Sequence, residues 1–483
     1  MNCKTISLFI ILMQLFFTAA FTQITLPKIL GHNMVLQRNE PVPIWGMATA
    51  GEVITVSFGS QIKTTTTGVD GKWKIFLDAM PASFLQQTLK ISSSTDVIEL
   101  KNILVGEVWL CSGQSNMEFA MRKLVKLHPP TGANWPVNEV AEAKNENLRI
   151  FLVERKKMNP DTTNEGWSAA IEPGLKNFSA VGYFFGKRIY EKLNVPVGII
   201  SAAIPGSRIE PWMPLEGFAD ISFFKNADGS VKKMEGDVGK FYESMIAPLV
   251  PFALKGFLWY QGESNCFLNE RLSYAYKMKA LIQYWRKVWS DDKLPFYYVQ
   301  IAPYFYSKAT DRQYTVYSEP EFWEVQSAVL KVPNTAIVAT VDLNDDPADL
   351  HPVNKWDVGK RLANSALSKT YKVNNSEPMG PVFKSAVRRK NYFVIDFAYK
   401  GKGLKTVDGK PLNSFEIADA SGNYYPGKAI IKRNKIRVTA ANVHLPIAVR
   451  FAWREDARPN LINSDGLPAF PFRTNNSVVE KFN

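Results

Sequence analysis

Short apolar runs alternate with stretches of helical periodicity between about residues 103 and 371, and this alternation restricts the fold more than any other feature. Runs typical of buried strands lie at 103–111, 148–153, 197–203, 256–260, 296–301 and 336–341. Strands that alternate with helices pair in parallel. We therefore expect an α/β domain whose ligand site lies at the carboxyl ends of its strands.

A different pattern flanks this region on both sides. From about 23 to 102 apolar and polar residues alternate, as in Trp73, Ile75 and Leu77, and similar alternation returns over 372–483. Such alternation is typical of half-buried strands. We expect an SGNH-hydrolase-like parallel sheet in the centre, with a β-sandwich domain before it and a β-sandwich-type domain after it.

The first 22 residues have the pattern of a secretory signal peptide. Lys4 precedes an apolar stretch at 6–17, and small residues at 18–20 offer a cleavage site. The stretch is too short to span a membrane comfortably. We expect an exported protein, periplasmic or extracellular, without a membrane span in its mature form.

Composition excludes several classes of partner. The chain is 46% hydrophobic and 21% charged, as in ordinary globular proteins, and its net charge is +13. Lysines and arginines are scattered among acids, so no nucleic-acid partner is expected. No phosphate-binding loop or closely spaced His/Cys set occurs, so we expect neither a nucleotide nor a metal cofactor. Oligomeric state is left open.

A polar turn at 113–116 (Gly-Gln-Ser-Asn) joins the first predicted strand to a helix. Met117, Met121 and Leu124 after it lie on one helical face. Ser115 therefore sits in a strand-to-helix turn, beside unpaired N–H groups at a helix start. This setting suits a nucleophile whose attack on a carbonyl creates an oxyanion.

A serine nucleophile needs a base, and the chain has four histidines. His32 and His444 lie in the flanking β segments, and His128 precedes two prolines. His351 follows the last predicted strand of the central region through a polar, aspartate-rich loop. We expect it at the same sheet edge as Ser115.

Three aspartates are candidates to orient His351. Asp349 lies two residues before it, and in an extended stretch both side chains would share one face. Asp342 and Asp346 are also close in sequence. Asp349 is favoured, but spacing leaves the choice open.

A second turn at 262–265 (Gly-Glu-Ser-Asn) also follows an apolar run, which makes Ser264 a rival nucleophile. Gln261, Glu263 and Asn265 crowd this turn with hydrogen-bonding groups, and they favour a supporting role at the oxyanion site. A polar turn that only caps a helix is the alternative.

Two cysteines, Cys111 and Cys266, each lie beside one of these turns. An exported compartment would permit a disulfide between them. Packing as two small buried hydrophobes is the slightly favoured alternative.

Several long strings resemble the sialate O-acetylesterase family of SGNH-type esterases. Residues 108–117 (Val-Trp-Leu-Cys-Ser-Gly-Gln-Ser-Asn-Met) are similar to its nucleophile block, and 259–265 (Trp-Tyr-Gln-Gly-Glu-Ser-Asn) to a later block. Further similarity, nearly from end to end of the chain, covers 34–38, 43–46, 459–461 and 466–474.

The resemblance implies a carbohydrate O-acetylesterase, a carboxylic ester hydrolase that acts on acetylated sugars or glycans. It implies Ser115 as nucleophile, His351 as base and Asp349 as orienting acid. Many SGNH esterases separate the acid from the histidine by two residues, whereas only Leu350 intervenes here. The acid could therefore lie elsewhere, or a Ser-His dyad could suffice.

For the oxyanion hole, the resemblance implies the N–H groups of Ser115 and Gly206, with a side-chain amide from Gln261 or Asn265. Residues 204–205 (Ile-Pro) stand where a second glycine is common in the family, which would reshape the acyl pocket.

Substrate contacts are expected from Trp212 and Asn116. Arg208 is a candidate to meet a sugar carboxylate, with a surface salt bridge as its other use. Substrates left open are 9-O-acetylated sialate, acetylated xylan and other polysaccharides. Two other classes of function are alternatives to an esterase. One is a glycosidase that uses Glu263, and the other is a non-catalytic glycan-binding protein.

Overall fold

The computed structural model describes residues 23–126, 135–153, 166–309, 314–373 and 375–483. The predicted signal peptide and His128 lie outside these ranges. No helix among the described residues combines the length and apolarity that a membrane span requires.

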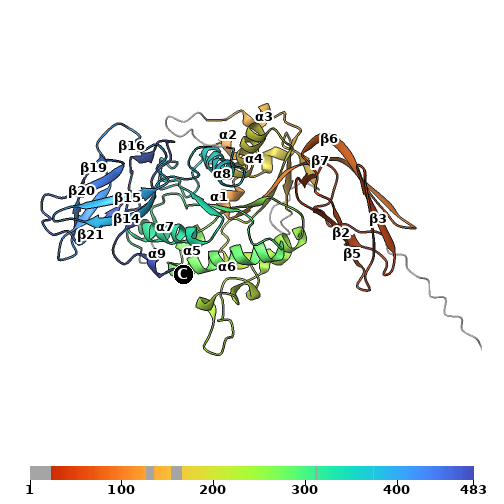
Figure 1. The fold of residues 1–483 in the computed structure, drawn as a ribbon, viewed down its shortest axis with the longest axis horizontal. Helices are drawn as coiled ribbons and strands as arrows, with labels where there is room; N and C mark the ends of the chain where they lie inside the picture. Colours follow the sequence, from red (N-terminus) through yellow and green to blue (C-terminus); the bar gives the residue numbers. More distant parts are fainter. Residues whose placement is uncertain (1–22, 127–134, 154–165, 310–313, 374) are drawn as a thin grey trace, which may run out of the picture.

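A mixed sheet forms the centre of the molecule (Figure 1). Its order is β13-β12-β11-β7-β10-β8-β9. The bounds are β7 (Val97–Gly113), β8 (Leu148–Leu152), β9 (Trp167–Ala169), β10 (Val197–Ala203), β11 (Gly256–Tyr260), β12 (Phe296–Val299) and β13 (Thr335–Val338). All pairs along this path are parallel except β8 with β9. The expected parallel core is therefore present, with an unpredicted antiparallel strand at one edge.

Helices cover both faces of this sheet. Figure 1 shows α4 (Ala180–Leu193) and α8 (Lys355–Lys369) on one side, and α6 (Leu272–Val288) and α7 (Ser318–Ala328) on the other. Trp109 of β7 packs its ring 5.0 Å from that of Phe185 on α4. Trp259 of β11 packs 5.8 Å from Trp285 on α6. Burial on both faces explains why these strands are continuously apolar. The shorter helices are α1 (Ser115–Glu118), α2 (Lys123–Lys126), α3 (Glu139–Glu142), α5 (Glu263–Cys266) and α9 (Val478–Lys481).

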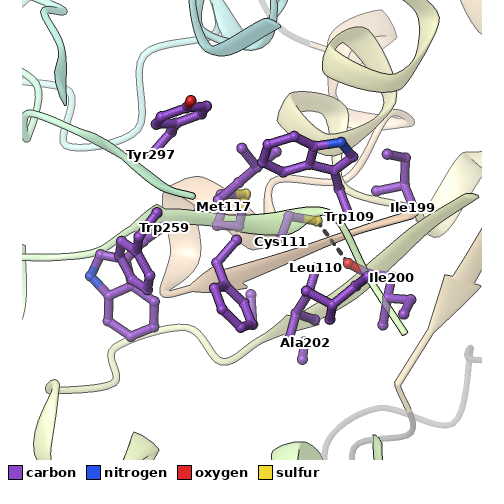
Figure 2. Close-up of a cluster of buried hydrophobic side chains, with 14 of the residues drawn as sticks. Trp109, Leu110, Cys111, Met117, Ile199, Ile200, Ala202, Trp259 and Tyr297 are labelled. Atoms are coloured by element: carbon purple, nitrogen blue, oxygen red, sulfur yellow. Dashed lines mark hydrogen bonds between the residues drawn. The ribbon is translucent and has the colours of Figure 1, made fainter. Parts of the chain in front are cut away.

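The core beneath the turns is closely packed and contains one of the cysteines. In Figure 2, Cys111 lies among apolar side chains of β7 and β10, and its Sγ donates to the carbonyl of Ile200 at 3.2 Å. Burial raises the pKa of the Cys111 thiol to about 12. Cys111 and Cys266 are both free and buried, so they pack as small hydrophobes and form no disulfide.

The N-terminal β region shares a strand with the central sheet. The first half of β7 pairs antiparallel with β6 (Ser83–Ser92), and its second half pairs parallel with β10 and β11. The expected boundary at 102/103 thus falls inside a continuous strand, at Asn102, whose φ is +61°. The other strands are β1 (Val35–Gln37), β2 (Val42–Met47), β3 (Val53–Phe58), β4 (Gln61–Thr66) and β5 (Lys72–Leu77).

The C-terminal region is antiparallel and has its own hydrophobic core around Phe415 and Phe451. One sheet has the order β14-β15-β20-β19, another β18-β17-β21-β23, and β16 pairs with β22. The bounds are β14 (Val382–Arg388), β15 (Phe393–Ala398), β16 (Leu404–Thr406), β17 (Phe415–Ala418), β18 (Tyr424–Pro426), β19 (Lys428–Lys432), β20 (Lys435–Thr439), β21 (Ala448–Phe451), β22 (Leu461–Asn463) and β23 (Phe472–Arg473).

Candidate active site

The two Gly-x-Ser-Asn turns are neighbours at the carboxyl edge of the sheet. Gly113 pairs with Tyr260 across β7 and β11, and the N–H of Gln114 donates to the Tyr260 carbonyl at 2.9 Å. Gly113 has a φ of +139°, and a Cβ there would lie 2.1 Å from that same carbonyl oxygen. Only glycine fits this close approach, so it determines where the chain turns and presents Ser115.

The side chain of Gln114 ties the second turn to the first. Its Oε1 accepts from the N–H groups of Gly262 and Ser264 at 3.4 and 3.3 Å, and from Nε2 of Gln261 at 3.2 Å. The second turn therefore braces the first.

Ser115 and His351 meet although 236 positions separate them. The Nε2 of His351 lies 2.8 Å from the Oγ of Ser115. Ser115 begins α1 one residue after the end of β7, and His351 lies in the loop between β13 and α8. The two atoms are at a normal hydrogen-bond distance, which allows a proton to pass from the nucleophile to its base. Ser264 has no such bond among the described residues.

The surroundings of His351 favour its neutral form. Burial lowers the pKa of the imidazole below its ordinary 6.5, and the positive charge of Lys355 lowers it further. The carboxylates of Asp349 and Glu118 act in the opposite direction. A neutral imidazole at neutral pH is the form that can accept a proton.

Asp349 does not hold the ring as expected. Its Oδ1 accepts from the main-chain N–H of His351 at 2.8 Å, because the chain bends here instead of running extended. Asp342 binds Arg361, and Asp346 accepts from the N–H of Ala348. Within the described ranges no carboxylate bonds to the ring, so the expected link from Asp349 to the imidazole is absent there.

The two residues whose main-chain N–H groups were expected to form the oxyanion hole lie at the same pocket. Ser115 and Gly206 both line the pocket, and neither N–H has an acceptor among the residues the structure describes. Gly206 has a φ of +69°. Two unpaired donors in one pocket can stabilise negative charge that develops on a carbonyl oxygen.

Gln261 and Asn265 do not line the pocket. Both are completely buried, and Nε2 of Gln261 donates to Oδ1 of Asn265 at 2.7 Å. Oδ1 of Asn265 in turn accepts from the N–H of Ile209 at 3.1 Å. The expectation that either side chain reaches an oxyanion is wrong: both brace the loop that carries Gly206, because their side chains point under the turn.

Trp212 and Arg208 also lie outside the pocket, so neither can contact a substrate there. Trp212 is completely buried, and its ring packs 5.9 Å from that of Trp259. Arg208 donates to Glu210 at 3.4 Å and does not line the pocket. The interpretation of both as substrate contacts is therefore wrong. Trp212 is a core residue, and Arg208 forms an ion pair with Glu210.

Asn116 and Glu263 form a buried pair. The Nδ2 of Asn116 donates to Oε1 of Glu263 at 2.5 Å and to the carbonyl of Leu350 at 3.1 Å. Asn116 is fully buried, so it supports the site and does not contact substrate. Burial raises the pKa of Glu263, whose exposed fraction is 1%. Glu263 borders the pocket, but its burial and its bond to Asn116 count against a glycosidase acid, which must reach a sugar in a cleft.

The pocket has a volume of about 570 Å³. Besides Ser115, Gly206 and His351, its lining includes Phe119, Phe267, Leu350, Glu118 and Lys123. These five were not singled out from the sequence, where apolar residues after a turn and a lysine on a short helix carry no distinguishing signal. In the described ranges, no three His, Cys, Asp or Glu side chains are grouped as metal ligands.

Comparison with known proteins identifies the family of this chain. Residues 105–368 match the family model described as carbohydrate esterase, sialic acid-specific acetylesterase. The chain is 28% identical to the rat sialate O-acetylesterase, with 87% of this chain and 88% of the rat protein covered. It is 27% identical to the human sialate O-acetylesterase, with 92% and 91% covered.

A solved structure extends the similarity to the fold. The crystal structure of a carbohydrate acetylesterase from Xanthomonas citri is 34% identical, with a TM-score of 0.81, and the match covers 94% of this chain and 100% of that chain. The chain therefore belongs to the sialic acid-specific acetylesterase family of carbohydrate esterases, and it is a carbohydrate O-acetylesterase.

Proposed function

We propose that Ser115 and His351 remove acetyl groups from a sugar through an acetyl-enzyme intermediate. The observation that carries this proposal is the 2.8 Å contact between Oγ and Nε2 in a pocket wide enough for a sugar. Ser115 attacks the ester carbonyl while His351 accepts the hydroxyl proton. The negative charge that develops on the carbonyl oxygen is stabilised by the N–H groups of Ser115 and Gly206.

The second half of the cycle uses the same groups. The protonated His351 gives its proton to the departing sugar oxygen, which leaves the acetyl group on Ser115. Water then attacks this acyl group as His351 takes its proton. His351 gives that proton to the Oγ of Ser115 as the bond from Oγ to the acyl carbon breaks, and acetate is released. The bond from Asp349 to the main chain supports a dyad in which the loop, and not a carboxylate on the ring, orients the imidazole.

As substrate we propose an O-acetylated sialic acid. The names of the rat and human relatives support this choice. Lys123 supports it as well, because it lines the pocket and could meet the sugar carboxylate. Its Nζ is 3.4 Å from Glu118, with 40% of its side chain exposed, so this pair can open at little cost. Acetylated xylan is the second candidate. Acetate release from both substrates distinguishes them.

We further propose an SGNH-like central domain between an N-terminal β-sandwich and a C-terminal β domain, close to the ranges 23–102, 103–371 and 372–483. The separate core of the last range supports this division. Export to the periplasm or the extracellular space is proposed from residues 1–22. Fractionation of cells that express the chain with and without these residues tests it.

The reaction is tested by p-nitrophenyl acetate hydrolysis in Ser115→Ala, with Ser264→Ala as a matched control. Ser115→Ala should reduce kcat by at least about a thousandfold, since a nucleophile is lost. Ser264→Ala should stay within about threefold of wild type, because the link from Gln114 to this turn uses the main-chain N–H of residue 264. Equal rates for wild type and Ser115→Ala would contradict the proposal.

A further inference from the structure

Lys355 is a buried amine beside the site, and the proposed reaction does not explain its role. It is the first residue of α8, and its exposed fraction is 0%. No salt bridge joins it to a carboxylate within the described part of the chain. An ammonium group buried without such a partner is costly. Its presence at this buried position therefore indicates a role that an apolar side chain would not supply.

The contacts of Lys355 connect the loop of the base to the wall of the pocket. Its Nζ donates to the carbonyl of Pro352, the residue after His351. The same Nζ lies 4.5 Å from the ring centroid of Phe119, a residue that lines the pocket. A cation above an aromatic ring is stabilised by the ring quadrupole. One side chain thus holds the histidine loop against Phe119, the residue that ends the helix of the nucleophile.

Two other side chains hold the same loop. The Nδ2 of Asn344 donates to the carbonyl of Asp349 at 3.0 Å, and that of Asn116 donates to the carbonyl of Leu350 at 3.1 Å. With Lys355 on Pro352, the carbonyls of the two residues before His351 and of the one residue after it are fixed. This accounts for how the ring can be oriented without a carboxylate bonded to it.

We propose that Lys355 is a positioning residue for His351: its amine fixes the loop, and its positive charge opposes a second positive charge on the imidazole. This inference rests on the proposed role of His351 as the base. It goes beyond that role because it assigns part of the control of the base to a residue outside the Ser-His pair.

The charges around both groups determine the direction of the effect. His351 faces the positive charges of Lys355 and Lys123 and the carboxylates of Asp349 and Glu118. Burial lowers the pKa of Lys355 to about 7, with Asp349 acting against this shift.

Glu263 also favours the charged form of Lys355, and Lys123 disfavours it. Lys355 therefore gains its charge as the pH falls toward the range where an imidazole is protonated. The positive charge of Lys355 thus appears in the pH range in which it is needed to keep His351 neutral.

The experiment compares Lys355→Met with Lys360→Met. Lys360 lies on the same helix, has 53% of its side chain exposed and pairs with Asp357. For p-nitrophenyl acetate, Lys355→Met should lower kcat by about tenfold or more. KM should stay within about twofold of the wild-type value, since substrate contacts are intact. The midpoint of the acidic limb of kcat/KM should rise by about one pH unit. Lys360→Met should match wild type in kcat, in KM and in the acidic midpoint of kcat/KM.

A second variant separates charge from position. Lys355→Arg keeps a permanent charge but changes the reach of the donor, so kcat should fall while the acidic midpoint stays at or below that of wild type. If Lys355 were needed only for folding, the acidic midpoint of kcat/KM would not rise in Lys355→Met while staying unchanged or falling in Lys355→Arg. Circular dichroism and thermal denaturation check that each variant is folded.

The outcomes decide the inference. An unchanged acidic midpoint in folded Lys355→Met, or a raised midpoint in Lys355→Arg, would overturn it; if Lys355→Met does not fold, the Arg variant decides. Failure of the proposed function is recognised separately, because Ser115→Ala would then retain activity.

Discussion

Asn116 and Glu263 are joined by a hydrogen bond of 2.5 Å between Nδ2 and Oε1, and this bond ties the residue after the nucleophile to the second turn. The same Nδ2 also reaches the carbonyl of Leu350, one residue before His351. One buried amide therefore links three segments that are far apart in the sequence. The Ser115–His351 distance depends on such links, because no single element carries both residues.

Removing this amide should separate the nucleophile from its base. Asn116→Ala leaves Glu263 and the Leu350 carbonyl without their donor, which we expect to cost about 1–3 kcal/mol of unfolding free energy. We expect kcat to fall about tenfold to a hundredfold. Denaturant unfolding and p-nitrophenyl acetate kinetics measure these effects. Asn226→Ala, which removes an exposed bond to Ser230, is the control and should change neither. Wild-type kcat in Asn116→Ala would refute the link.

Glu263→Gln should retain esterase activity within about tenfold, because the amide oxygen can still accept from Asn116. A glycosidase acid replaced in this way would lose its activity far more completely. Burial raises the folded-state pKa of Glu263. Its contribution is therefore most favourable below the unfolded value of about 4.5 and declines as pH rises through the folded pKa. The stability of the Gln variant relative to wild type should accordingly be greater at pH 8 than at pH 4, as measured by urea unfolding. The opposite trend would contradict a raised pKa of the buried Glu263.

Two glycines at the site should differ in their tolerance of alanine. Gly113→Ala places a Cβ 2.1 Å from the carbonyl oxygen of Tyr260, so the turn must move and activity should be lost. Gly206→Ala meets open space and incurs only a positive-φ strain of about 1–2 kcal/mol. Its N–H is retained, so we expect it to keep at least about a tenth of wild-type kcat. Parallel kinetics and melting curves test the pair. The reverse order of activity would be inconsistent with the geometry.

The pH dependence of wild type follows from His351. Since burial and the charge of Lys355 lower its pKa, the base should be lost only as pH falls below 6.5. The acidic midpoint of kcat/KM, measured from pH 4 to 8, should therefore lie below 6.5. A midpoint above that value would show that nearby carboxylates outweigh burial.

The structure distinguishes Lys123, which lines the pocket, from Arg208, which does not. Lys123→Gln should raise KM for an O-acetylated sialic acid by about threefold to tenfold and leave that for p-nitrophenyl acetate unchanged. Arg208→Gln is the matched control. It should leave both KM values unchanged, because Arg208 lies outside the pocket lining. Equal effects of the two substitutions would remove Lys123 from substrate recognition.

Part of this protein could be derived from the linear sequence. The alternation of apolar runs and helical stripes predicted the parallel core and its change to antiparallel sheets near residue 372. The strand-to-helix turn at Ser115 and the loop position of His351 placed both at one sheet edge. These features are readable because they depend on periodicity and on glycine geometry, which act over a few residues.

Side-chain direction at the site was decided only by the tertiary structure. Asp349 bonds to the main chain instead of the ring, Gln261 points beneath its turn, and Trp212 packs into the core. Lys355 gave no signal, because a lysine at a helix start is usually solvated. Spacing along a chain determines which residues can meet. The packing of distant segments determines which polar groups face the pocket and which are used to hold it together.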